Sequence, residues 1–132
     1  MTRDGYEKTL EEILKERAEV LGRTGTALQE VLEKLEKLDS SIKYKLEIFR
    51  SMTDERKQAH DRSLIDVINE EIGLYNATRK QAQVRYYYLI VTREALGLRK
   101  HKWAEEIYRI PPRKKTLTLS NIIKAEEPKV DG

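Results

Sequence analysis

Apolar residues recur every seven positions along the first fifty residues of the chain. The main series is Leu14, Leu21, Leu28, Leu35, Ile42 and Phe49, and a second series of Leu10, Val31 and Leu38 is offset from it by three or four positions. Most of the residues between them are Glu, Lys and Arg. A stripe of this kind, sustained over about five heptads, is typical of a coiled-coil helix. We therefore predict a helix over residues 5–50.

A second apolar stripe follows a polar break at residues 51–55. Its members are again three and four positions apart: Ile65, Ile68, Ile72, Tyr75, Ala82, Tyr86, Leu89 and Leu96. Ser51 or Thr53 can cap the start of this helix. Gly97 followed by Leu98 is typical of a helix end, because glycine readily takes the left-handed conformation there. The pattern predicts a second helix over residues 54–97.

A short connection between two long helices favours an antiparallel hairpin. A turn near residues 51 and 52 would place Leu14 opposite Leu89 and Leu38 opposite Ile65. We therefore expect residues 1–98 to form one helical hairpin.

The first helix carries two glycines, Gly22 and Gly25, in its middle. Glycine inside a helix costs about 0.5–1 kcal/mol relative to alanine. Three explanations stay open: a flexible point, a tolerated irregularity, or the close approach of another helix. A phosphate-binding loop is excluded because the flanking pattern is helical and no Lys-Ser or Lys-Thr follows.

The chain has more apolar residues than one hairpin seam can bury. Around residues 84–91, VRYYYLIV, the second helix is apolar or aromatic on nearly every side. A helix of this kind is covered from several directions, here by the chain's own C-terminal segment or by another subunit. We predict an all-α fold in which two hairpins dimerise into a four-helix bundle.

After Gly97 the pattern changes, and residues 99–132 form a separate C-terminal segment. Residues 101–108 can make a short helix with Trp103 and Ile107 on one side, and Pro111-Pro112 ends it. Residues 116–120 alternate like a short strand. We expect the last residues, EEPKVDG, to be disordered.

This segment is basic. Residues 99–115 hold seven Lys or Arg and two Glu. The predicted partner-binding residues are Arg99, Lys100, Lys102, Trp103, Tyr108, Arg113, Lys114 and Lys115. In one interpretation Trp103, Ile107 and Tyr108 pack on the apolar cluster of the hairpin, and the Lys and Arg residues lie beside the acidic start of the first helix. Alternatively, the segment contacts nucleic acid through phosphates and unpaired bases, or binds another protein.

Composition limits the bonds, metal sites and cellular compartments that we expect for the protein. The 132 residues carry a net charge of +3 and no cysteine, so disulfides and thiolate metal sites are excluded. The N-terminus lacks the apolar region of a signal peptide, and no apolar run reaches the roughly 18 residues of a membrane span. We expect a cytoplasmic protein that does not enter a membrane.

The sequence carries no recognisable catalytic pattern. The only histidines, His60 and His101, are predicted at opposite ends of the hairpin, and no nucleophile motif is present. We expect no cofactor and no bound metal. Arg79 and Arg93 lie on the core-facing seam, where each needs a partner or access to water.

The sequence therefore predicts a protein that is not an enzyme. We expect a scaffold, adaptor or assembly protein, forming a homodimer and acting through coiled-coil surfaces and the basic segment. A nucleic-acid-binding protein that uses residues 99–115 is the alternative.

Overall fold

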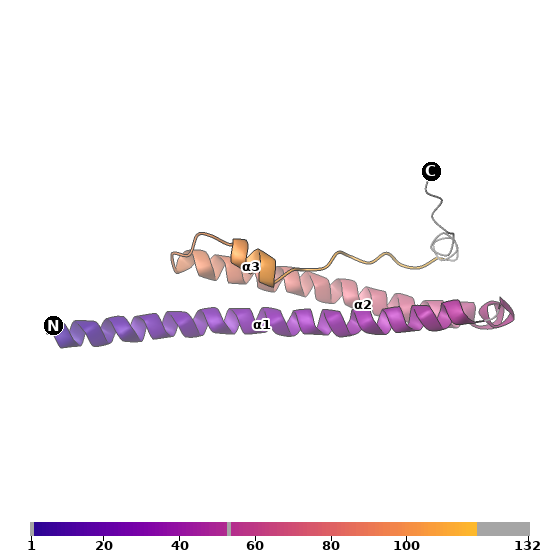
Figure 1. Ribbon diagram of the computed structural model, residues 1–132, viewed down its shortest axis with the longest axis horizontal. Helices are drawn as coiled ribbons and strands as arrows, with labels where there is room; N and C mark the ends of the chain where they lie inside the picture. Colours follow the sequence, from indigo (N-terminus) through magenta and orange to yellow (C-terminus); the bar gives the residue numbers. More distant parts are fainter. Residues whose placement is uncertain (1, 53, 119–132) are drawn as a thin grey trace. The chain divides into compact units, whose positions relative to one another are not determined.

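Two long helices make up most of the protein. The computed structural model describes the backbone of residues 2–52 and 54–118, and the side chains of these ranges except residues 56–62. It contains α1 (Arg3–Ser51), α2 (Asp54–Ala95) and the short α3 (Lys102–Ile107) (Figure 1). No strand occurs in these ranges. The prediction of an all-α fold with two long helices packed against each other is confirmed. The expected disorder of EEPKVDG lies outside the described residues.

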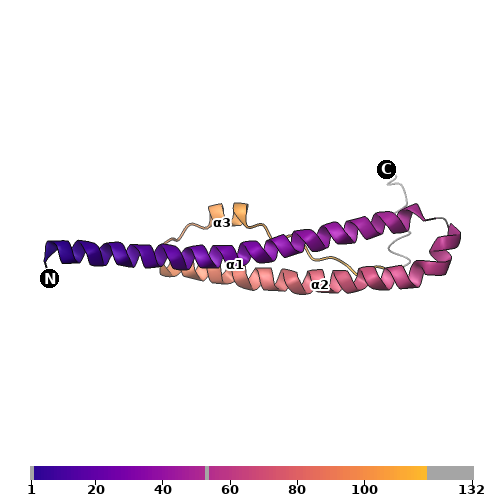
Figure 2. The same ribbon diagram turned by 90° about the horizontal axis from the view of Figure 1, so that it is seen from below.

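The chain forms two compact units, and each contains part of both long helices. Unit 1 comprises Met1–Lys34 and Arg79–Pro111, and unit 2 comprises Leu35–Thr78 and Pro112–Gly132. Within each unit, α1 and α2 lie side by side and antiparallel (Figure 2). The division into a hairpin over 1–98 and a segment over 99–132 stays a prediction.

The buried side chains follow the heptad stripes. On α1 they are Leu28, Val31, Leu35, Ile42 and Phe49, and on α2 they are Ile65, Ile68, Ile72, Tyr75, Ala82 and Leu89. Unit 2 adds a polar contact between the helices, in which Glu71 on α2 accepts hydrogen bonds from Ser41 and Lys45 on α1. The burial of side chains at heptad spacing holds the two helices together.

The register between the helices differs from the predicted one. A turn centred at residues 51 and 52 placed Leu38 opposite Ile65, whereas Phe49 packs against Ile65 in the structure. Ile65 therefore lies about three helical turns farther along α1 than predicted. The hydrogen bonds from Ser41 and Lys45 to Glu71 fit the same shifted register.

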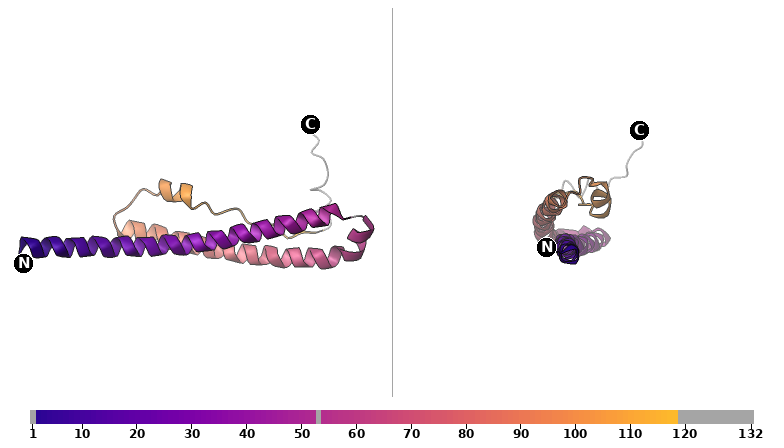
Figure 3. Two further views of the ribbon diagram at one scale, coloured as in Figure 1. Left: turned by 60° about the horizontal axis from the view of Figure 1, so that its bottom comes forward. Right: turned by 90° about the vertical axis from the view of Figure 1, so that its left-hand side faces the viewer.

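The shift arises at the start of α2. Its first turns cross the end of α1 at an angle before the helix turns back along α1 (Figures 2 and 3). Although these turns are helical, they connect the two paired stretches of helix and are not themselves paired with α1. The position of the loop in the sequence therefore does not mark the midpoint of the helix pairing.

In unit 1 the start of α1 is unpaired. α1 continues past the end of α2 (Figure 2), and from Tyr6 to Val20 every residue is exposed. Leu14, which the predicted register buried against Leu89, is 55% exposed. Its exposure is a correction to the predicted pairing.

The end of α2 has the predicted glycine cap. Gly97 has a φ of 86°, and its N–H donates to the carbonyl of Glu94 while the N–H of Leu98 donates to the carbonyl of Arg93. These two bonds satisfy carbonyls that the helix end leaves open. The cap turns the chain toward α3. At the other end of the connection, Ser51 donates back to Ile48 within α1, and Thr53 lies outside the described residues.

Candidate functional site

The short helix α3 buries a small residue within unit 1. Ala104 is fully buried, and Tyr108, one turn later, is partly buried. Trp103 and Ile107, the pair expected to face the hairpin, are 56% and 51% exposed. The side chain of α3 that is buried is therefore the short Ala104, while Trp103 and Ile107 stay more than half exposed. Figure 3 shows where α3 lies beside the long helices of unit 1.

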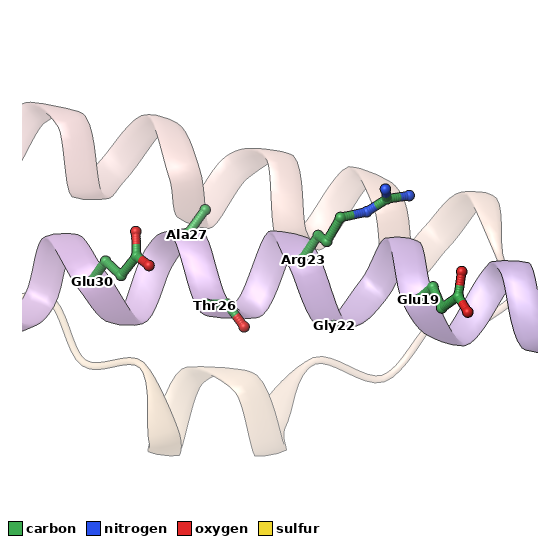
Figure 4. Close-up of a pocket in the computed structure, with 6 residues that line it drawn as sticks. All are labelled: Glu19, Gly22, Arg23, Thr26, Ala27 and Glu30. Atoms are coloured by element: carbon green, nitrogen blue, oxygen red, sulfur yellow. The ribbon is translucent and has the colours of Figure 1, made fainter.

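Gly25 on α1 lies against Tyr108, the residue that follows α3. A Cβ placed on Gly25 would lie 3.0 Å from the hydroxyl oxygen of Tyr108, whereas a Cβ on Gly22 would meet nothing within 4 Å. Gly22 lies in an open depression of α1 beside Glu19 and Arg23 (Figure 4). Of the three explanations left open for these glycines, close approach therefore applies to Gly25, where the neighbour is a tyrosine at the end of α3.

The two arginines on the seam of α2 bind carbonyl oxygens of the C-terminal segment. Arg79 Nε donates to the carbonyl of Pro111 at 2.8 Å, and Arg93 Nη2 donates to the carbonyl of Lys100 at 2.9 Å. The guanidinium of Arg93 also lies 5.6 Å from the centre of the Trp103 ring. Both charges therefore have partners, which come from the chain itself.

His101 links the end of α2 to the start of α3. Its Nδ1 accepts a bond from Arg93 Nε at 3.4 Å, and its Nε2 lies 3.1 Å from Glu94 Oε1. With Nδ1 as the acceptor, the imidazole carries its proton on Nε2 and donates to Glu94. Both contacts join His101, in the loop before α3, to side chains at the end of α2.

Residues 112–118, which we call the strap, run as an extended chain along α2 in unit 2 (Figure 1). The side chain of Asn76 bonds both the N–H and the carbonyl of Lys114, at 3.0 and 2.9 Å. Asn69 does the same with Leu117, at 2.7 and 3.0 Å. Tyr75 donates its hydroxyl to the carbonyl of Pro112 at 3.2 Å.

Two strap side chains also contact the long helices within unit 2. Lys114 Nζ lies 2.5 Å from Asp39 Oδ1 and 4.9 Å from the centre of the Tyr75 ring. Leu117 packs against the cluster of Phe49 and Ile65. The alternating pattern predicted a strand here, and the described part, residues 116–118, is not one, because helix side chains rather than a second strand take its backbone bonds.

The predicted partner-binding residues fall in both units. In unit 1, Arg99, Lys100, Lys102 and Trp103 are exposed, and Tyr108 is partly buried. In unit 2, Arg113 and Lys115 are exposed, while Lys114 is occupied by Asp39 and Tyr75.

Sequence reasoning did not find the residues that bind the strap. Asn69 and Asn76 are two of only three asparagines in the chain, and they lie seven apart on one face of α2. Asparagine is a weak helix former, so its repetition at heptad spacing inside a long helix was an available signal.

Apolar side chains remain exposed on unit 1. They lie on the unpaired start of α1 (Tyr6, Leu10, Ile13 and Leu14), on α2 (Val84, Tyr87, Tyr88 and Val91) and on α3 (Trp103 and Ile107). The C-terminal segment therefore covers only part of the apolar surface around residues 84–91.

The described residues show no group of three His, Asp or Glu that could hold a metal ion. None of the described helices is long and apolar enough to cross a membrane. Comparison with known proteins gives no match to a family model, to a curated protein or to a solved structure.

The contact between Gly25 and Tyr108 makes the two glycines unequal. Gly22→Ala should raise the free energy of unfolding by about 0.5–1 kcal/mol, because it removes the glycine penalty without meeting a neighbour. Gly25→Ala should gain less or lose stability, because the Tyr108 hydroxyl has to move. Chemical denaturation followed by circular dichroism measures both values.

Tyr108→Phe supplies the control, since it removes the hydroxyl. Gly25→Ala in that background should recover a gain close to that of Gly22→Ala. Equal gains for both glycines in the otherwise unchanged protein would contradict the close contact.

Asp39 should make the stability of unit 2 sensitive to acid. The hydrogen bond from Lys114 and that from Lys43 hold the pKa of Asp39 below its ordinary value. A carboxylate with a lowered folded pKa stabilises the fold above the unfolded pKa, near 4, and this contribution is lost as the pH falls through the folded value.

The free energy of unfolding of the unchanged protein should therefore fall more than that of Asp39→Asn between about pH 6 and pH 3, by up to about 1 kcal/mol. Urea unfolding at a series of pH values gives the comparison. Parallel pH profiles for the two proteins would show that the ion pairs of Asp39 do not stabilise the fold.

Proposed function

We propose that this protein is a non-catalytic helical scaffold or adaptor that binds protein subunits through apolar helix faces, and that a second copy of the chain is one such subunit. The observation that carries the proposal is the exposed apolar surface of unit 1. Contiguous apolar patches on soluble proteins commonly mark interaction sites. The lack of cysteine favours a reducing compartment such as the cytoplasm as its setting.

The start of α1 supports this proposal most directly. Leu10 and Leu14 lie one turn apart with Ile13 between them, and all three are exposed. Most of the stability of a helix in a protein comes from the packing of its apolar face. A partner helix laid along this stripe would stabilise it, as in a helical bundle.

The tyrosine face of α2 supplies a second exposed surface. Tyr87 and Tyr88 lie with their ring centres 6.2 Å apart, and both rings are more than half exposed. Tyrosine and tryptophan are enriched where proteins bind one another, because they combine a large apolar area with a polar group. Two copies packed through these surfaces would form the four-helix bundle expected from the sequence.

Size-exclusion chromatography with light scattering tests self-association. The unchanged protein should be a dimer, and Leu10→Glu with Leu14→Glu should dissociate it, because two charges would be buried in the contact. Lys8→Gln with Lys15→Gln changes the net charge by the same amount on the opposite face of α1 and should leave the dimer intact.

A monomer at every concentration would contradict self-association. So would a dimer that neither pair of substitutions weakens, because it would form elsewhere on the chain.

Nucleic-acid binding is the second candidate function, favoured by one observation. Arg99, Lys100 and Lys102 have exposed side chains and lie within four residues of Trp103 in the sequence, and Trp103 itself is 56% exposed. Cationic groups beside an aromatic face can bind phosphates and stack on an unpaired base.

Binding of single-stranded oligonucleotides at increasing salt separates the two candidates. If residues 99–103 bind nucleic acid, affinity should fall steeply with salt. Arg99→Gln with Lys100→Gln and Lys102→Gln should then reduce the slope of log affinity against log salt by about 0.7 for each phosphate that is no longer neutralised. The absence of binding at low salt would remove this candidate.

A further inference from the structure

The strap is held by contacts that any extended peptide could make. Asn69 and Asn76 each bond the N–H and the carbonyl of one strap residue, and Tyr75 bonds the carbonyl of Pro112. Backbone groups are common to every residue except for the missing N–H of proline. These contacts therefore fix the path of an extended chain without selecting its sequence.

The spacing of the two asparagines matches an extended chain. Seven residues of helix separate Asn69 from Asn76, a rise of about 10 Å. Three extended residues separate Lys114 from Leu117, a span of about 10 Å as well. The two carboxamides therefore bond backbone groups three residues apart without distorting either chain.

Sequence selection comes from two side-chain sites. The first is the Asp39 carboxylate with the Tyr75 ring, which takes the ammonium of Lys114. The second is the apolar cluster of Phe49 and Ile65, against which Leu117 packs. Together they select a lysine followed, three positions later, by an aliphatic residue.

The strap is only partly buried on this surface. Lys114 and Leu117 are only partly buried, and most of the other strap residues are exposed. The strap has the bonding pattern of a bound peptide rather than that of a buried core element. A competing segment with the same lysine and aliphatic residue would make the same bonds, so the exchange costs little beyond the loss of the covalent tether.

We infer that the Asn69–Asn76 face of α2 is a binding site for an extended segment of a partner protein that carries a lysine and, three residues later, an aliphatic residue. The strap is the built-in occupant of this site, and the partner segment displaces it. The carboxylate of Asp39 is the charge complement that favours a lysine-bearing occupant. This inference concerns unit 2 and does not rest on the apolar faces of unit 1.

The probe is a fluorescein-labelled peptide of strap sequence, residues 109–118 (RIPPRKKTLT), added to the full-length protein. Lys114→Ala with Leu117→Ala weakens the strap while leaving the site on α1 and α2 unchanged. Fluorescence anisotropy should show saturable binding to this variant, and binding to the unchanged protein should be weaker by about tenfold or more, since its own strap competes at high effective concentration.

Asn69→Ala with Asn76→Ala, added to the strap-weakened variant, should reduce peptide affinity by about tenfold or more, because four hydrogen bonds are removed. Gln83→Ala, which removes an exposed amide elsewhere on α2, should not change it. A peptide with alanine in place of its Lys114 and Leu117 equivalents tests the same selectivity with the protein untouched, in case the asparagine variant does not fold.

Three outcomes would overturn the inference. The first is no binding to the folded strap-weakened variant, and the second is equal binding of the native and the doubly substituted peptide. The third is a dimer of the unchanged protein that Lys114→Ala with Leu117→Ala dissociates, because the occupant would then be the strap of a second copy. A dimer through unit 1 would survive those substitutions, so failure here and failure of the proposed scaffold role are distinguishable.

Discussion

The packing of apolar side chains between α1 and α2, in one particular register, is the constraint on which the rest of the structure depends. Burial of Leu35 and Ile42 on α1 and of Ile68 and Ile72 on α2 provides the main favourable energy within unit 2. In unit 1, Leu28 and Leu89 are buried in the same way. Because a heptad seam can slide by whole repeats, polar contacts such as those of Glu71 with Ser41 and Lys45 help to select one register.

The register also decides which surfaces are covered. In unit 1 it leaves the first turns of α1 without a helix beside them, and it brings Gly25 to the place where Tyr108 arrives from α3. In unit 2 it places Asp39 where it meets Lys114 while Asn69 and Asn76 hold the backbone of the strap. The exposed apolar faces and the occupied peptide site are therefore both consequences of how the helices are paired.

Heptad periodicity predicted the two helices and most of their buried residues, because a repeating stripe depends only on local geometry. Gly97 predicted the end of α2 for the same reason. The register was mispredicted because the first turns of α2 are helical yet serve as part of the connection, and the apolar pattern does not distinguish these two roles.

The C-terminal segment was harder to predict, because its structure depends on contacts between residues distant in sequence. Trp103 and Ile107 were expected to pack and are exposed, since the buried face of α3 is set by the small Ala104 and by Gly25 on α1. The basic residues were interpreted as one group, although Lys114 is bound within the protein while Arg113 and Lys115 are exposed. The side chains that hold the strap are polar residues of α2, which a search for apolar periodicity passes over.

Cysteine cross-linking tests the register of α1 and α2 most directly, since the chain has no cysteine of its own. Ser41→Cys with Glu71→Cys joins two positions whose native side chains are hydrogen-bonded at 3.0 Å. Leu38→Cys with Ile65→Cys joins two positions that a turn centred at residues 51 and 52 would place opposite each other. With a short bifunctional thiol reagent, and isotope mixing to exclude links between chains, the first pair should cross-link within one chain much faster than the second. Faster cross-linking of the second pair would contradict the register and, with it, the account of the exposed and occupied surfaces.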